Sequence, residues 1–186
     1  MQSRCLHPQR YLTSYFALLS PLPIRLFVYR RCAAAFGMKI IYAGRQARND
    51  LPFEAEFVGN IESFWPRCQM VSLHAPLTPE TRGLMNTAII AALPDGAIIV
   101  NTARGELIDY DALVAALASG KVAAAGLDAF TGEPAFDARY AAQPRTFLLP
   151  HLGSATVETR TAMGMRALAN IDAFFAGKPV PDAWFK

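Results

Sequence analysis

Short apolar segments alternate with amphipathic ones along the chain from residue 32 onward. Five segments are apolar without strict alternation, which is typical of strands that a parallel sheet buries on both faces. They are MKIIYA (38–43), MVSLHA (70–75), AIIVNTA (97–103), AAAGLDA (123–129) and TFLLP (146–150). The pattern therefore predicts a parallel β-sheet.

Helix signals lie between these segments. Asp109 is a candidate N-cap for a helix over residues 110–119, and Gly120 follows where a C-terminal glycine belongs. Asn86 or Thr87 is expected to begin a shorter helix. The alternation of strands and helices predicts a doubly wound, Rossmann-like α/β fold.

The chain ends with a long helical pattern over residues 156–176, with Glu158 in its first turn and Gly177 after its last. A helix of this length is too long for a simple crossover between strands. We expect it to belong to a second domain that is mostly absent from this chain.

The first strand of the sheet is the element that the pattern does not supply. A glycine loop should follow that strand, yet residues 1–36 contain no glycine. The apolar segment IRLFVY (24–29) is separated from Met38 by only eight residues, and a parallel crossover needs a dozen or more. The sequence therefore predicts a sheet that lacks the first strand and its glycine loop.

Residues 1–31 form an apolar leader with no acidic residue. A membrane span and a signal peptide are weaker explanations, because Pro21, Pro23 and Arg25 interrupt the stretch and no small-residue cleavage site follows promptly. We expect the leader to be disordered or foreign sequence, from a frameshift, a truncated gene or a misassigned start. A purposeful leader that anchors the chain to a membrane or partner is the weaker alternative.

Composition narrows the classes of function. The net charge of +3 includes five arginines in the leader, so the remainder carries −2 and offers no basic patch for a nucleic acid. Cys5, Cys32 and Cys68 have neither paired spacing nor matching histidines, which argues against a disulfide framework and a metal site. We expect a cytoplasmic protein with no membrane, metal or nucleic-acid partner.

Polar residues follow the predicted strands at one edge of the sheet, where open α/β folds bind ligands. Arg104, Asp128 and His151 come at the ends of three strands, and Glu133 lies in the loop after Asp128. Arginine can bind a carboxylate with two hydrogen bonds, and histidine can exchange a proton near neutral pH. Each residue alone is more often a solvated or turn residue, but together they favour acid–base chemistry on an anionic substrate.

Four segments together resemble the D-2-hydroxyacid dehydrogenase family, in the order and spacing of that family. They are VSLHAPLTPETRGLMN (71–86), IIVNTARGELID (98–109), AAGLDAFTGEP (124–134) and LLPHLGSAT (148–156). The resemblance extends over residues 30–186. It implies an NAD(P)-dependent oxidoreductase that acts on a small 2-keto or 2-hydroxy acid and forms a homodimer at full length.

The resemblance also implies a role for each candidate residue. Arg104 would bind the substrate carboxylate and carbonyl, His151 would protonate the carbonyl oxygen, and Glu133 would keep His151 basic. The implied cofactor-binding residues are Gly44, Arg45, Arg48, His74, Ala75, Pro76, Thr102, Ala103, Arg104, Asp128, His151 and Ser154. The implied domains are a partial NAD(P)-binding domain over residues 32–150 and, over 151–186, the histidine loop and helix of the substrate domain.

The end of the second strand bears on the choice of cofactor. An acidic residue there binds the ribose of NAD, whereas an arginine accommodates the 2′-phosphate of NADP. Gly44 occupies the acidic position here, with Arg45 and Arg48 nearby. YAGRQAR (42–48) also resembles the glyoxylate and hydroxypyruvate reductases of the family. NADP is therefore expected over NAD, although exposed arginines are common in loops.

Two classes of function stay open. One is an NADP-dependent reductase of glyoxylate or hydroxypyruvate type, impaired in this chain because it lacks the glycine loop and substrate domain. The other is a non-catalytic fragment, such as a cofactor-binding or corepressor-like interaction subunit.

Overall fold

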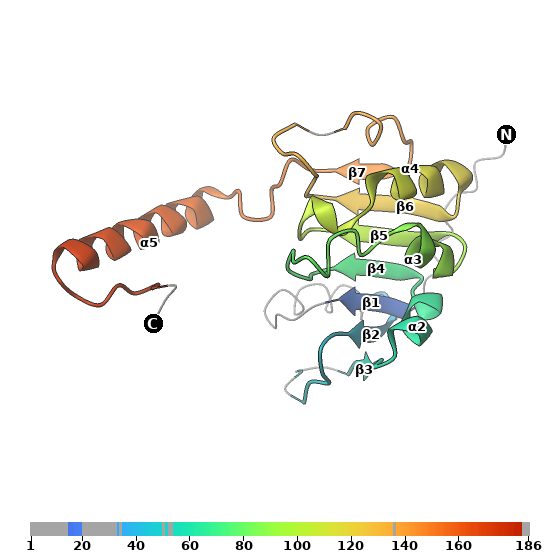
Figure 1. Ribbon diagram of the computed structural model, residues 1–186, viewed down its shortest axis with the longest axis horizontal. Helices are drawn as coiled ribbons and strands as arrows, with labels where there is room; N and C mark the ends of the chain where they lie inside the picture. Colours follow the sequence, from blue (N-terminus) through green and yellow to red (C-terminus); the bar gives the residue numbers. More distant parts are fainter. Residues whose placement is uncertain are drawn as a thin grey trace. The chain divides into compact units, whose positions relative to one another are not determined.

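The computed structural model describes residues 15–19, 33, 35–49, 51, 54–135 and 137–183. Of these, the residues up to 150 include a seven-stranded sheet and its helices (Figure 1). The strands are β1 (Tyr15–Leu19), β2 (Lys39–Ala43), β3 (Glu56–Phe57), β4 (Met70–Leu73), β5 (Ala97–Asn101), β6 (Val122–Leu127) and β7 (Thr146–Leu148). Their order is β3-β2-β1-β4-β5-β6-β7, and every neighbouring pair is parallel. The doubly wound α/β prediction is confirmed, and the five predicted strands are β2, β4, β5, β6 and β7.

The prediction that the sheet lacks its first strand is wrong. β1 lies at the centre of the sheet, where Phe16 pairs with Ile40 of β2 and Met70 of β4 (Figure 1). It comes earlier in the chain than the segment 24–29 considered for this role, which lies outside the described residues. Nineteen residues, 20–38, therefore separate β1 from β2, enough for a parallel crossover. Part of the predicted leader thus belongs to the sheet.

Among the described helices, the three longest begin close to where local signals predict them. They are α2 (Ile61–Phe64) with the 3₁₀ turn η2 (Trp65–Arg67), α3 (Thr87–Ala92), the 3₁₀ turn η3 (Gly105–Leu107), α4 (Tyr110–Ser119) and α5 (Val157–Phe175). The Asp109 carboxylate accepts a hydrogen bond from the N–H of Ala112 at 3.0 Å, and Gly120 ends α4 with φ of 82°. Asn86 caps α3 in the same way, through the N–H of Ile89. Short α2 and β3 were not predicted, because each is too brief to show a period.

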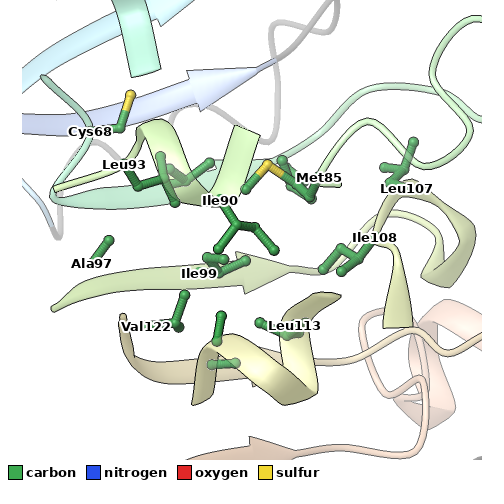
Figure 2. Packing of buried hydrophobic residues seen from close by; sticks show 14 of the residues in the cluster. Cys68, Met85, Ile90, Leu93, Ala97, Ile99, Leu107, Ile108, Leu113 and Val122 are labelled. Atoms are coloured by element: carbon green, nitrogen blue, oxygen red, sulfur yellow. The ribbon is translucent and has the colours of Figure 1, made fainter. Parts of the chain in front are cut away.

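The core lies between the sheet and α3 and α4 (Figure 2). Ile90 of α3 and Leu113 of α4 are buried against Ile99 of β5. Burial alternates along β5, where Ile98 and Val100 on the opposite face are only half-buried. The prediction of strands buried on both faces therefore fails for β5, and it also fails for β6 and β7, whereas consecutive residues are buried in β2 and β4.

The chain divides into two compact units, Met1–Pro150 and His151–Lys186. In the second unit, Arg166 of α5 binds the carboxylate of Asp182 through two hydrogen bonds of 2.6 and 2.7 Å. Asn170 also bonds with Asp182, which ties the segment after α5 back to the helix. Within the described residues, no helix is both long and apolar enough to cross a membrane.

Candidate functional site

The predicted site residues of the first unit follow the carboxyl ends of parallel strands, which lie at one edge of the sheet. Gly44 follows β2, His74 follows β4, Thr102 follows β5 and Asp128 follows β6. The chain order reverses between β1 and β4, which are neighbours at the centre of the sheet. Ligands of open α/β folds bind in the crevice at such a reversal.

Asn101 fixes the loop that carries Arg104. Its fully buried side-chain amide donates to the carbonyl oxygen of Arg104 at 2.8 Å and accepts from the N–H of Ala103 at 3.0 Å. The Arg104 guanidinium is exposed and donates to the carbonyl oxygen of Ala103 at 2.7 Å. The backbone around Arg104 is thus held rigidly, while its cationic side chain lies at the surface.

The loop after β6 is attached to Asn101 as well. The N–H of Asp128 donates to the carbonyl oxygen of Asn101 at 2.9 Å, and the side chain of Asp128 is buried. Further along, the Glu133 carboxylate accepts a hydrogen bond of 2.6 Å from the N–H of Phe130. Glu133 therefore closes its own loop, which positions its carboxylate relative to the end of β6.

Gly105 brings these two loops into direct contact. A Cβ atom at this position would lie 2.1 Å from the carbonyl carbon of Phe130 and 2.3 Å from the nitrogen of Thr131. Real Cβ atoms are not found this close to other backbone atoms, so only glycine fits. The loops of Arg104 and Glu133 consequently pack backbone to backbone.

Ser72 of β4 and His74, the first residue after that strand, form a buried pair. The Ser72 hydroxyl and His74 Nε2 are 2.8 Å apart, and the tautomer of the ring decides which one donates. Further along, hydrogen bonds from Thr78 and from its own backbone lower the pKa of Glu80, and the charge of Arg45 lowers it further. The Glu80 carboxyl in the loop after β4 is thus held in its ionised form chiefly by the hydrogen bond from Thr78.

The loop after β2 carries the predicted cofactor-selecting residues. Gly44 and Arg45 are exposed, and Arg48 is half-buried. The N–H of Arg48 donates a hydrogen bond of 2.8 Å to the hydroxyl of Tyr42, a buried residue of β2. The segment 44–48 is thus tied back to β2 through this hydrogen bond.

His151 and Ser154 belong to the second unit, at its start. His151 comes three residues after the end of β7 and has φ of 55°, which is uncommon for a residue other than glycine. The hydroxyl of Thr156 then caps α5 by accepting from the N–H of Thr159. The expected catalytic residues are therefore divided between the units, with Arg104 and Glu133 in the first.

A cavity of about 450 Å³ lies beside the contact between these loops, but none of the predicted site residues lines it. Its walls include Glu106, Tyr110, Phe130 and Thr131. The candidate site is instead the sheet edge at which the carboxyl ends of the strands lie. Among the described residues, no group of three histidine, cysteine or carboxylate side chains could hold a metal ion.

The residues at the sheet edge fit a nicotinamide dinucleotide. Asp128 and His74 provide buried polar groups directly after β6 and β4, and the exposed Arg45 provides a positive charge after β2. Sequence reasoning missed three supporting residues: Tyr42, Asn101 and Gly105. Only Asn101 carried a local signal, since asparagine often bonds to the backbone two residues on.

The fold and this sheet edge define a dinucleotide-binding α/β domain, and comparisons with known proteins specify the family. The model of the D-isomer specific 2-hydroxyacid dehydrogenase NAD-binding domain matches residues 28–153. The chain is 44% identical over 148 residues to the glycerate dehydrogenase of Hyphomicrobium methylovorum, covering 78% of this chain and 46% of that protein. It is 38% identical over 152 residues to a glyoxylate reductase of Thermococcus litoralis, with 81% and 46% covered.

A solved structure is similar as well. The NADPH-dependent glyoxylate/hydroxypyruvate reductase of Sinorhizobium meliloti, in complex with NADP and malonate, matches with a TM-score of 0.79 and 32% identity. The match covers 88% of this chain and 50% of that one. The chain belongs to the D-isomer specific 2-hydroxyacid dehydrogenase family, as its four motifs predicted. It spans about half the length of the relatives it matches.

Proposed function

We propose that this chain provides the cofactor-binding and proton-transfer residues of an NADPH-dependent reductase for small 2-keto acids of the glyoxylate or hydroxypyruvate type. The observation that carries the proposal is the attachment of the Arg104 loop to the Glu133 loop through Asn101 and Gly105. Relatives named glyoxylate reductase and hydroxypyruvate reductase support this substrate class. We further propose a cytoplasmic homodimer as the complete enzyme.

Each residue has a distinct task in this proposal. The bound nicotinamide supplies or accepts the hydride. Arg104 binds the substrate carboxylate with charge-assisted hydrogen bonds, which orients the keto group. His151 donates a proton to the carbonyl oxygen, and the Glu133 carboxylate favours the protonated ring. Asp128 orients the carboxamide, and the oxidation of a hydroxy acid reverses the same transfers.

Turnover tests this function directly. Our assay protein is a chimera that joins this chain to the half of the Hyphomicrobium methylovorum glycerate dehydrogenase that it does not match. We expect the chimera to oxidise NADPH with saturable dependence on glyoxylate or hydroxypyruvate. A folded chimera without turnover on either acid contradicts the proposal.

A non-catalytic role for the 186-residue chain is the second candidate, because its first glycine is Gly37, immediately before β2. Glycines after the first strand allow the backbone to approach the cofactor pyrophosphate. Under this second candidate, the chain alone binds nucleotide without oxidising NADPH. Saturable NADPH oxidation by the chain alone would contradict it.

Arg104→Ala in the chimera is expected to raise the KM for the keto acid and lower kcat/KM by about 10- to 100-fold, since charged hydrogen bonds contribute roughly 1.5–3 kcal/mol. Steady-state kinetics with glyoxylate measure the effect. Arg160→Ala in α5 provides the matched control, with kinetics close to those of the parent. Equal kinetics in Arg104→Ala and the control would remove Arg104 from the substrate site.

Arg45→Ala in the chimera is expected to raise the KM for NADPH by about tenfold and the KM for NADH by less than about twofold. The reason is that only NADPH carries a 2′-phosphate that the guanidinium can bind. The ratio of the two KM values measures this preference. Arg67→Ala serves as the control, because the Arg67 guanidinium is already paired with the Glu56 carboxylate of β3. Equal losses for both cofactors would show that Arg45 does not recognise the phosphate.

A further inference from the structure

Tyr42 connects the interior of the sheet to the loop that carries Arg45 and Arg48. Its side chain is 7% exposed, and its ring packs against Phe57 of β3 with ring centroids 5.2 Å apart. Its backbone carbonyl accepts from the N–H of Val58, which holds the same residue in the β2–β3 pair. Tyr42 is therefore held by β2 and β3 and offers its hydroxyl from a fixed position.

The hydroxyl of Tyr42 accepts a hydrogen bond of 2.8 Å from the N–H of Arg48, six residues further along. The residues between them, 43–47, include the exposed Gly44 and Arg45. Fixing an exposed residue costs conformational entropy, so an unanchored loop binds an anion less tightly. The bond to Tyr42 removes part of this cost before any ligand arrives.

We propose that Tyr42 is a positioning residue for recognition of the 2′-phosphate, which it supports by holding residues 43–48 through the N–H of Arg48. This inference rests on the proposed preference for NADPH. It adds that cofactor selection depends on a buried hydroxyl of β2 as well as on the charges of the loop. The guanidinium groups of Arg45 and Arg48 then extend from a backbone that is already ordered.

The test compares Tyr42→Phe with the parent in the 186-residue chain. The probes are adenosine 2′,5′-bisphosphate and adenosine 5′-monophosphate, which differ by the phosphate in question, and calorimetry or ligand-detected NMR measures each Kd. We expect the parent to prefer the bisphosphate. Tyr42→Phe should raise the Kd for the bisphosphate about three- to tenfold, the range of a single hydrogen bond, and change the Kd for the monophosphate by less than about twofold.

Tyr140→Phe is the matched control, because Tyr140 is similarly buried, at 6%, and lies near the loop after β6. It should leave both Kd values unchanged. Hydrogen exchange measured by mass spectrometry gives a second readout that is independent of ligand. Tyr42→Phe should speed exchange in peptides that cover residues 43–49 and leave peptides of β5 and β6 as in the parent.

The outcomes separate the two proposals. A parent chain that binds the two nucleotides equally, or does not bind the bisphosphate, overturns the NADPH preference and the role of Tyr42 together. A parent that prefers the bisphosphate and a Tyr42→Phe variant with the same preference overturn the role of Tyr42 alone. Equal weakening of both nucleotides, or faster exchange throughout the sheet, also overturns it, because the hydroxyl then supports the fold in general.

Discussion

Replacing His151 with asparagine in the chimera is expected to lower kcat by about 10²- to 10⁴-fold, the range that general acid catalysis typically contributes. Asparagine can still donate a hydrogen bond to a carbonyl oxygen, but its amide cannot transfer a proton near neutral pH. The substitution therefore removes the acid and keeps a polar side chain of similar reach. Single-turnover NADPH oxidation with glyoxylate measures the step that is lost.

Cofactor affinity shows whether the loss is chemical. NADPH should bind His151→Asn with a Kd within about threefold of the parent, because the adenosine end of the site belongs to other residues. Unchanged kcat, or a loss of activity matched by an equal loss of NADPH affinity, would exclude His151 as the proton donor.

The parts of the fold that the sequence predicted are those with local causes. Asp109 and Gly120 mark the ends of α4 because an N-cap and a left-handed glycine act within one turn of the helix. β1 was missed because it is defined by its pairing with β2 and β4, which are distant in sequence. Residues 1–36 contain no glycine, so no glycine loop marks the end of this strand in the sequence.

The residues of the candidate site likewise fall into those that the sequence predicted and those that it did not. Arg104 and Asp128 were predicted to follow strands at one edge of the sheet, and the parallel order places them there. The hydroxyl of Tyr42 accepts a hydrogen bond from the backbone of Arg48, and Gly105 leaves room for the backbone of Phe130. Only the folded chain brings these groups together. No local pattern distinguishes such residues from an ordinary strand tyrosine or loop glycine.

Gly105→Ala is expected to lower the free energy of unfolding of the 186-residue chain by about 3 kcal/mol, the upper end of the usual cost of overpacking, because the new atom meets backbone that cannot move aside alone. The new Cβ would lie 2.1 Å from the carbonyl carbon of Phe130, so the two loops must separate. Urea unfolding followed by far-ultraviolet circular dichroism measures the change.

Gly126→Ala is the matched control, since its added Cβ would lie 3.9 Å from a side-chain atom of Val100, an ordinary contact. It should change the free energy of unfolding by no more than about 1 kcal/mol. In the chimera, Gly105→Ala should also lower kcat/KM by about 10²-fold or more, because it shifts Arg104 relative to Glu133 and small misplacements of catalytic groups are costly. If both alanine variants are equally stable and active, the backbone contact at Gly105 does not set the geometry of the site.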